Sequence, residues 1–348
     1  MSGFPAPLRL RLDGDALVSN WRWLAARSGS AACGAAIKAD GYGLGAAQVM
    51  RRLLQAGCRD FFVSNWNEAA AVEPLLADGI GLSVLHGVRS EDMARARASR
   101  ARPVLNTPEQ VARWKGAGGG PCDVMIDTGM NRLGLDWRGD IAGLTDGLML
   151  ETLLSHLASA DEDSDFNGRQ LARFVYVKDG VAAHRFSFAN SAGICLGADY
   201  AFDLTRPGLA LYGGIPREEA DGPIRPVVAP QAQILQRRRV IAGDSIGYNT
   251  TFTATADIDV AILNIGYADG YLRGFSGKGA VMLDGVVMPV LGRVSMDLLA
   301  VDVSARADVA EGDWLTIAYA LPHAARTSGL SQYELLTGLG ARFDRLWA

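Results

Sequence analysis

The sequence contains few of the residues that staple a fold or bind a metal. Its 348 residues include only four cysteines and four histidines. Cys33, Cys58, Cys122 and Cys195 lie tens of residues apart and form no Cys-x-x-Cys pair, which is evidence against a disulfide framework and against a zinc site. We therefore expect reduced thiols and no bound metal, as in a protein of the reducing cytoplasm.

Long apolar runs and a strong net charge are also absent. No run approaches the ~18 apolar residues of a membrane-spanning helix, and residues 1–13 contain no apolar stretch of a secretory signal. The formal net charge of −4 is evidence against nucleic acid as a main partner. With 49% hydrophobic and 21% charged residues, the composition is that of a globular protein. We expect a cytoplasmic protein of about two domains that binds neither nucleic acid nor membrane.

Residues 14–212 alternate short apolar runs with stretches of helical periodicity. The apolar runs lie near 33–37, 60–63, 82–85, 103–105, 122–126, 149–154, 184–188 and 204–211. Helices are expected over 46–57, from Glu68 with Asn67 as its cap, from Pro108 with Thr107 as its cap, and over 166–181. Eight strand–helix units match a (β/α)8 barrel in count and length. A doubly wound open sheet has the same alternation, but the count of eight favours the barrel.

The pattern changes after residue 225. Short β-branched runs separated by Gly, Asp and Pro lie at 226–228, 231–240, 259–265, 280–283, 286–291, 298–303 and 314–318. This spacing predicts an all-β domain with one late helix over 332–339. The expected fold class is therefore α/β, with an N-terminal (β/α)8 TIM-like barrel over 12–224 followed by a C-terminal all-β domain over 225–348. Residues 1–11 are a candidate addition to the β domain.

Two motifs place cationic side chains directly after predicted strands, where barrels carry their active sites. Lys38 opens the segment Lys-Ala-Asp-Gly-Tyr-Gly after the first run. It is either a surface lysine beside a flexible turn or a partly buried lysine with a lowered pKa that forms a Schiff base. Arg132 follows Asp127-Thr-Gly-Met-Asn after the fifth run, and a guanidinium there suits a carboxylate or phenolate oxygen.

Three further motifs follow the sixth, seventh and eighth predicted strands. His156 ends the sixth run, although a lone histidine is more often structural. Asn190-Ser191-Ala-Gly opens a helix after the seventh, and Arg206-Pro-Gly208 follows the eighth. Small residues and a serine at these two positions are typical of a barrel phosphate site. In the β domain, Tyr248, Tyr267 and Arg293 lie in glycine-containing turns, each of which alone is typical of a β-turn with a packed aromatic neighbour.

In this order along the chain, from Lys38 to Trp347, these motifs resemble those of the alanine racemase family of fold-type III enzymes. The resemblance implies pyridoxal 5'-phosphate as cofactor and alanine as the small-molecule substrate. It also implies a head-to-tail homodimer whose active sites are shared between both chains. Racemisation of L-alanine and D-alanine would supply D-alanine for peptidoglycan synthesis in the cell wall.

The resemblance assigns the two catalytic bases to Lys38 and Tyr248, the latter supplied by the partner subunit. Lys38 would serve the D-face of the substrate and Tyr248 the L-face. An unperturbed tyrosine has a pKa of about 10, so Tyr248 needs nearby positive charge, expected from His156 and Arg206. Arg206 would also face the pyridine nitrogen of the cofactor.

The resemblance also assigns the substrate and cofactor positions. Arg132 and Met296 match positions for the substrate carboxylate, Met296 through its backbone N–H, while Tyr267 and Arg293 line the substrate path. The cofactor-binding positions are Lys38, Tyr42, His156, Asn190, Ser191, Arg206, Gly208, Leu209 and Trp347.

Four positions depart from the family pattern. Met125 stands where many members have a carbamate-bearing lysine, and it cannot form the anion that orients Arg132. Trp347 replaces a tyrosine, Ser187 a histidine and Asn249 a glycine, although Asn tolerates positive φ better than most residues.

Met125 and Trp347 motivate an alternative, a racemase of broader or shifted specificity that accepts serine. A decarboxylase of basic amino acids is a second rival, but the stretch around 243–245 lacks its cysteine. A non-catalytic cofactor carrier is a third, and the appended β domain with Tyr248 is evidence against it.

Overall fold

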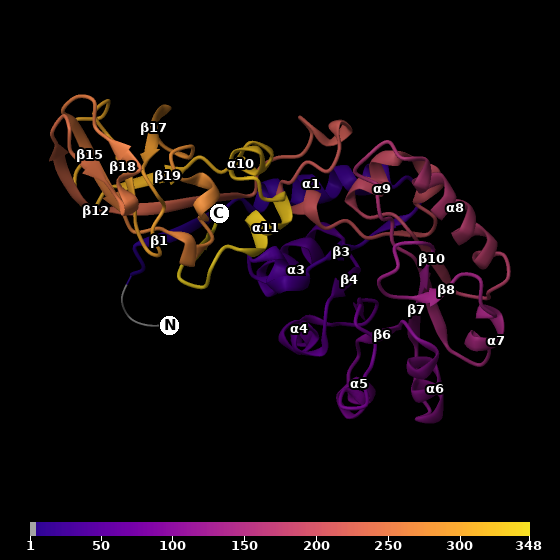
Figure 1. Ribbon diagram of the computed structural model, residues 1–348. Coiled ribbons are helices and arrows are strands. Elements are labelled where there is room, and N and C mark those ends of the chain that lie inside the picture. Colours follow the sequence, from indigo (N-terminus) through magenta and orange to yellow (C-terminus); the bar gives the residue numbers. More distant parts are fainter. Residues whose placement is uncertain (1–4) are drawn as a thin grey trace. The chain divides into compact units, whose positions relative to one another are not determined.

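The computed structural model describes residues 5–348, which form two compact units (Figure 1). One unit comprises Leu17–Arg225, and the other joins the segment up to Ala16 to Pro226–Ala348. All four cysteines are free and buried. Within residues 5–348, no helix is both long and apolar enough to cross a membrane.

The unit over Leu17–Arg225 is a closed parallel (β/α)8 barrel. Its strands are β2 Ala32–Cys33 with β3 Ala35–Ala36, β4 Asp60–Val63, β5 Gly81–Val84, β6 Arg102–Leu105, β7 Cys122–Asp127, β9 Leu150–Leu154, β10 Arg185–Ser187 and β11 Leu204–Thr205. The barrel closes because β2 pairs with β11 while β3 pairs with β4. The barrel prediction is confirmed, and all eight apolar runs overlap the observed strands. A short strand, β8 Leu135–Asp136, pairs with β7 outside the ring.

A glycine separates the two halves of the first strand. A Cβ at Gly34 would lie 2.8 Å from the carbonyl oxygen of Asp60 and 3.2 Å from that of Thr205. Gly34 thus lets the backbone approach both neighbouring strands closely where the barrel closes.

The barrel helices surround the strands (Figure 1). They are α1 Gly14–Arg27, α2 Lys38–Tyr42, α3 Ala46–Ala56, α4 Trp66–Val72, α5 Met93–Ala98, α6 Pro108–Gly116, α7 Ile141–Thr145, α8 Asp165–Lys178 and α9 Ser191–Leu196. The Thr107 cap of α6 and the Gly57 end of α3 are as predicted. The predicted cap of α4 is wrong: Asn65 accepts hydrogen bonds from the N–H groups of Asn67 and Glu68, so the helix begins at Trp66.

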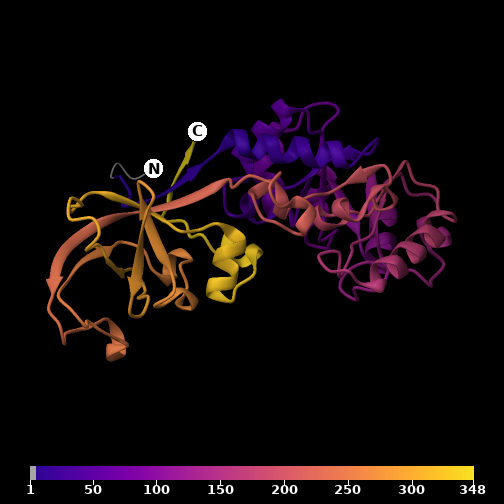
Figure 2. The ribbon, with the colours of Figure 1, turned by 90° about the horizontal axis from the view of Figure 1, so that it is seen from above.

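The second unit is a small antiparallel β-barrel, which confirms the all-β prediction. Its ring contains β12 Val228–Val240, β15 Ile258–Leu263, β18 Leu299–Asp302, β17 Val286–Leu291, β16 Ala280–Leu283 and β19 Trp314–Ile317. The ring closes because the long strand β12 pairs with β15 through its second half and with β19 through its first (Figure 2). Burial alternates along the first half of β12, residues 228–234, as expected for a strand with one face in a core.

Further elements extend this unit. Strand β1 Leu8–Leu12 pairs with β12 and with the last strand, β20 Asp344–Trp347. Two helices follow the ring, α10 Leu321–Ser328 and α11 Gln332–Thr337. The second lies where the late helix was predicted, while the first was missed. A short hairpin, β13 Ser245–Ile246 and β14 Phe252–Thr253, packs Ile246 and Phe252 onto a cluster that includes Val260 and Leu291.

Candidate active site

Lys38 lies directly after β3, at the C-terminal end of the barrel strands, and begins a left-handed turn. The four residues Ala39 to Tyr42 have φ of 53°, 52°, 62° and 54°. This conformation costs a non-glycine residue about 1–2 kcal/mol. The turn is stabilised by carboxylates: Glu68 Oε1 accepts from the Ala39 N–H at 3.0 Å, and Asp40 Oδ1 accepts from the Ala46 N–H at 2.8 Å. Strain stabilised from outside in this way is characteristic of functional sites.

The surroundings of the Lys38 amine lower its pKa. Burial lowers the pKa of Lys38, and the positive charges of Arg132 and Arg206 lower it further, against the opposing charge of Glu68. A lowered pKa increases the neutral, nucleophilic fraction of the amine near neutral pH. Lys38 is therefore a partly buried lysine with a lowered pKa, rather than a solvated surface lysine.

Arg206 follows β11 and is fixed by two oxygen acceptors. Its Nη1 donates to Ser187 Oγ at 2.5 Å and its Nη2 to the carbonyl oxygen of Ser155 at 2.6 Å. The side chain is buried, which lowers the pKa of Arg206 to about 10 and leaves it charged near neutrality. The sequence analysis identified Ser187 only as a departure from the family pattern. In the structure its hydroxyl accepts a hydrogen bond from Arg206 and helps to fix that side chain.

His156 lies in the same electrostatic environment but carries no charge near neutral pH. Burial lowers the pKa of His156 to about 3, and Arg206, Arg132 and Lys38 contribute in the same direction. The expectation that His156 acts as a cation is therefore wrong, because three neighbouring positive charges and poor solvation disfavour its protonation. Arg206 alone of this pair can supply positive charge.

A cradle of polar groups forms where the seventh and eighth strands end. Ser191 Oγ accepts from the N–H groups of Gly208 at 2.9 Å and Ala210 at 3.2 Å. Asn190 caps α9 by accepting from the Gly193 N–H at 2.8 Å. A Cβ at Gly208 would lie 2.2 Å from Tyr42 Oη, so only glycine allows the phenol to approach this backbone.

Tyr42 is fixed from its other side. Its ring stacks on the ring of Tyr212 with centroids 4.6 Å apart, and Tyr212 Oη donates to the carbonyl oxygen of Ala36 at 2.9 Å. Leu209, which follows Gly208, is buried and begins the short 3-10 helix η3 Leu209–Tyr212. A hydroxyl, a phenol and backbone N–H groups thus converge beside Lys38, a donor set that suits a phosphate group.

A buried glutamine, which the sequence analysis missed, joins two of the site loops. Gln170 Nε2 donates to Thr128 Oγ1 and to the carbonyl oxygen of His156, both at 3.0 Å, and its Oε1 accepts from the Ala158 N–H at 2.9 Å. Thr128 is itself hydrogen bonded to Ser155 at 2.9 Å. In the sequence, Gln170 stands out only as a polar residue on the apolar face of α8. Helical periodicity alone cannot show that it contacts loops distant in sequence.

Arg132 lies in the loop after β7. Asp127 Oδ1 shapes this loop by accepting from the N–H groups of Gly129 at 2.8 Å and Asn131 at 3.1 Å. The guanidinium of Arg132 is exposed and has no hydrogen bond or ion pair to any residue over 5–348. Met125 is buried and packs toward Gly134, so it fills apolar space without binding Arg132.

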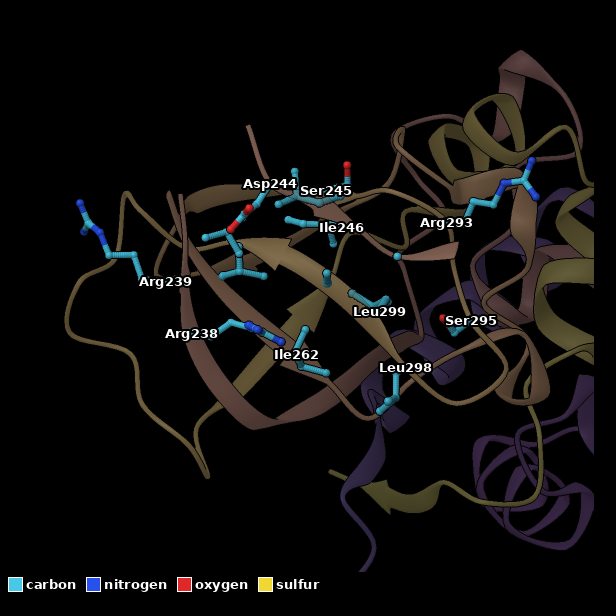
Figure 3. Close-up of a pocket in the computed structure, with 15 residues that line it drawn as sticks. Arg238, Arg239, Asp244, Ser245, Ile246, Ile262, Arg293, Ser295, Leu298 and Leu299 are labelled. Atoms are coloured by element: carbon cyan, nitrogen blue, oxygen red, sulfur yellow. The ribbon is translucent and has the colours of Figure 1, made fainter. Parts of the chain in front are cut away.

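The β unit presents Tyr248 on its hairpin. Tyr248 is 64% exposed, between Gly247 with φ of 78° and Asn249 with φ of 60°. The expectation that Asn249 adopts positive φ is confirmed. Next to this hairpin lies a cavity of about 360 Å³, around which Figure 3 shows Ser245, Ile246 and Arg293.

The remaining predicted residues of the β unit lie on connected turns. The Tyr267 N–H donates to the carbonyl oxygen of Ser295 at 3.0 Å, and Met296 is 53% exposed. Arg342 joins the two turns, because it contacts Asp269 at 2.7 Å and Asp297 at 2.7 Å. Trp347 ends β20, paired with Leu12 of β1.

The structure thus distributes the predicted residues over both units. The barrel brings the nine predicted residues Lys38, Tyr42, Arg132, His156, Asn190, Ser191, Arg206, Gly208 and Leu209 to the C-terminal end of its strands. The β unit carries Tyr248, Tyr267, Arg293, Met296 and Trp347. A lysine-bearing (β/α)8 barrel with a phosphate-type cradle, followed by a small β-barrel, defines a fold-type III pyridoxal-phosphate enzyme.

Comparisons with known proteins agree. Residues 12–216 match the alanine racemase N-terminal domain and residues 227–347 the alanine racemase C-terminal domain. The alanine racemase of Methylobacterium nodulans is 42% identical over 97% of this chain and 95% of its own length. A catabolic alanine racemase of Rhizobium johnstonii is 39% identical over 97% of this chain and 93% of its own. The chain belongs to the alanine racemase family and is an amino-acid racemase.

Two solved structures extend the comparison to three dimensions. The alanine racemase of Bartonella henselae with covalently bound pyridoxal phosphate has a TM-score of 0.91 and 34% identity, over 99% of this chain and 100% of that chain. The biosynthetic alanine racemase of Pseudomonas aeruginosa has a TM-score of 0.88 and 30% identity, over 99% of this chain and 100% of that chain.

Proposed function

We propose that this chain interconverts L-alanine and D-alanine with pyridoxal 5'-phosphate, using Lys38 and Tyr248 of the partner subunit as the two bases. The observation that carries the proposal is the cluster at the barrel end, where the partly buried Lys38 lies in the field of Arg132 and Arg206 beside the Ser191 and Gly208 cradle. When bound, the cofactor supplies an electron sink that makes the Cα–H of an amino acid acidic.

The barrel residues divide the tasks of holding the cofactor. Ser191, Gly208 and Leu209, with Tyr42 and Asn190, would hold its phosphate through hydroxyl, phenol and backbone N–H donors. Arg206 has donors only, so it favours an unprotonated pyridine nitrogen at its position. Trp347 contributes an indole N–H where relatives have a phenol. His156, neutral in this environment, would stabilise the ring through packing and hydrogen bonding rather than charge.

Inversion at Cα requires proton removal on one face and delivery on the other. Lys38, with its lowered pKa, accepts and returns a proton at its Nζ on the D-face. Tyr248 Oη does the same on the L-face. Arg132 binds the substrate carboxylate, helped by the backbone N–H of Met296, while Tyr267 and Arg293 line the path of the substrate.

The exposed surface around Tyr248 supports a homodimer with shared sites. Tyr248, Met296 and Leu298 are 64%, 53% and 38% exposed, although all three are large and largely apolar. Such side chains gathered on one unit mark a surface that another chain covers. We take that chain to be a second copy, placing its barrel site against this Tyr248.

The physiological role we propose is cytoplasmic supply of D-alanine for peptidoglycan. Four buried free cysteines suit a reducing compartment. Expression in a bacterium that requires D-alanine tests the role: growth without added D-alanine supports it, and continued dependence despite measurable racemase activity in the cells contradicts it.

A racemase of broader specificity is the second candidate, because no residue over 5–348 binds the guanidinium of Arg132 where relatives have a carbamate. Exchange of the Cα proton in heavy water separates the candidates when alanine and serine are compared at equal concentration. Faster exchange of alanine supports the first proposal, and faster exchange of serine supports the second.

Borohydride reduction of the purified yellow enzyme, followed by peptide mapping, tests the cofactor assignment directly. A pyridoxyl group on Lys38 is the expected result. A pyridoxyl group on another lysine, or none, contradicts the assignment.

A further inference from the structure

A large polar cavity lies at the opposite end of the barrel from Lys38. It has a volume of about 810 Å³ and is lined where β4, β5, β6 and β10 begin, together with the loop before β7. The N-terminal end of a (β/α)8 barrel normally serves stability, and none of the proposed catalytic residues reaches this cavity. Its volume is typical of a small-molecule site.

Arginine is the only strong cation that lines this cavity. The five arginines are Arg59, Arg97, Arg100, Arg102 and Arg185, and no lysine is among the lining residues. A guanidinium presents paired N–H groups that match the oxygens of a phosphate, whereas a lysine acts as a point charge. The lining is therefore suited to an oxyanion with several oxygens.

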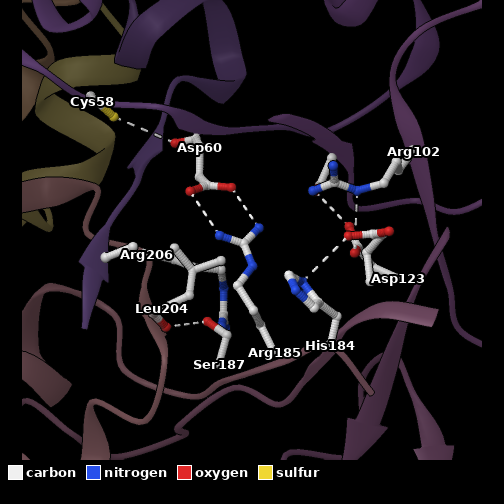
Figure 4. A network of polar contacts seen from close by, with 12 residues as sticks. Cys58, Asp60, Arg102, Asp123, His184, Arg185, Ser187, Leu204 and Arg206 are labelled. Atoms are coloured by element: carbon white, nitrogen blue, oxygen red, sulfur yellow. Dashed lines mark hydrogen bonds and ion pairs between the residues drawn. The ribbon is translucent and has the colours of Figure 1, made fainter. Parts of the chain in front are cut away.

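Two of these arginines are neutralised by acidic partners. Asp60 contacts Arg185 with both oxygens, at 2.7 and 3.0 Å, and Asp78 contacts Arg100 at 2.6 Å. Figure 4 shows the Asp60 and Arg185 pair within a buried network. The second acid that lines the cavity, Glu151, lies 3.8 Å from His184.

Two further arginines, Arg59 and Arg97, have no acidic partner over 5–348. Arg59 donates only to the carbonyl oxygens of Leu54 and Cys58, at 3.0 and 2.9 Å. The guanidinium of Arg97 is exposed and has no hydrogen bond or ion pair with the residues over 5–348. Positive charge is therefore in excess at the mouth of the cavity.

Arg102 lies further inside the cavity and is only loosely paired with Asp123. Its Nε lies 3.4 Å from Asp123 Oδ1 without forming a hydrogen bond, and both atoms are buried and unsatisfied. The other oxygen of this carboxyl, Oδ2, accepts from Ser83 Oγ at 2.6 Å, so Asp123 is shared between Arg102 and Ser83. The terminal nitrogens of Arg102 donate no hydrogen bond to residues over 5–348, and Gly81 leaves them room, since its Cβ would lie 3.1 Å from Nη2.

We propose that this cavity is a second binding site that takes a small phosphate monoester, with its phosphoryl group met by Arg97 and Arg102. The terminal nitrogens of Arg102 inside the cavity and the unpaired guanidinium of Arg97 at its mouth can both donate to phosphoryl oxygens. The cavity is also larger than a single phosphate ion, which leaves room for the organic part of a monoester. The site is independent of racemisation, because it lies at the end of the barrel that the substrate does not use.

Isothermal titration calorimetry of the holoenzyme tests this site, in a phosphate-free buffer of constant chloride. Glycerol phosphate and inorganic phosphate are the probes, and the cofactor occupies the phosphate cradle beside Lys38 throughout. We expect saturable binding of one glycerol phosphate per chain. Tighter binding of inorganic phosphate would assign the same site to the free ion.

Two variants and a control show where the probe binds. We expect Arg97→Gln to weaken binding at least fivefold and Arg102→Gln at least tenfold. Arg22→Gln removes an exposed arginine of α1 that has no partner over 5–348, and should leave binding unchanged. Because Arg97 has no structural contact to lose, its variant keeps the fold, as circular dichroism can verify. Absent binding, or equal binding by Arg97→Gln and the wild type, overturns the proposal.

Discussion

At the scale of single residues, His156 shows how surroundings override side-chain type. Its sequence context predicts a cation, but burial and three positive neighbours lower the pKa of His156 to about 3. The same field lowers the pKa of Lys38, where a neutral amine is useful. One cluster of charges thus keeps a lysine reactive and a histidine neutral.

The neutral state of His156 predicts a pH dependence of stability. An unfolded histidine has a pKa of about 6.5. Below that pH the imidazole of His156 is therefore protonated in the unfolded state but stays neutral in the folded state. Stability therefore falls with decreasing pH from about 6.5 towards the folded pKa of about 3. Between pH 7 and 5.5 we expect the wild type to lose about 1 kcal/mol more than His156→Gln. Urea unfolding of the cofactor-free proteins measures this, and equal losses would contradict the neutral assignment.

Gly208 predicts a steric effect on cofactor binding. A Cβ there would lie 2.2 Å from Tyr42 Oη, so Gly208→Ala must displace the phenol from the cradle. We expect at least tenfold weaker binding of pyridoxal phosphate, measured by equilibrium dialysis. Gly168→Ala is the matched control, because Gly168 lies in α8 with open space around its Cβ position. Wild-type affinity in Gly208→Ala would disprove the close-approach argument.

At the scale of elements, α8 is more than a cover for the barrel. Through Gln170 it joins the loop after β7, which carries Arg132, to the loop after β9, which carries His156. Helix and loops are far apart in sequence, so this connection exists only in the fold.

Replacing Gln170 should loosen both loops. Gln170→Leu retains the approximate size of the side chain but removes the hydrogen-bond partner of the Ala158 N–H and of the His156 carbonyl oxygen, while Thr128 keeps its hydrogen bond to Ser155. An unsatisfied buried group costs about 1–3 kcal/mol, so we expect a lower thermal midpoint. We also expect a KM for alanine raised several-fold, because Arg132 is less well positioned. Val175→Ser, on the exposed face of α8, should alter neither quantity. A lower midpoint with unchanged KM would limit Gln170 to a stabilising role.

The regular strands and helices were predictable from the sequence, but some of the turns and caps between them were not. The eight barrel strands follow from apolar runs, and Thr107 and Gly57 follow from cap chemistry. The left-handed turn after Lys38 was not predicted, because Ala39 and Asp40 adopt it only under contacts from Glu68 and Ala46. Asn65 rather than Asn67 caps α4 for a similar reason: two asparagines, two positions apart, give the same local signal.

At the scale of the whole molecule, the proposed chemistry is divided between two units. Residues of the barrel provide Lys38 and the phosphate cradle, while the β unit provides Tyr248 on an exposed hairpin. Both sets are predictions from the order of motifs along the chain. That order could not reveal Gln170, the support of Arg206 by Ser187, or the arginine-lined cavity around Arg102, because these depend on contacts between distant segments.

The central claim is that each active site combines Lys38 of one chain with Tyr248 of the partner subunit. Mixing two inactive variants, Lys38→Ala and Tyr248→Phe, under conditions that exchange subunits tests it most directly. Random exchange gives about half heterodimers, each with one intact site of two, so activity should recover to about a quarter of the wild type. Each variant taken alone through the same exchange is the control. No recovery, despite heterodimers detected by native mass spectrometry, would mean that each chain builds its site alone and would contradict the account.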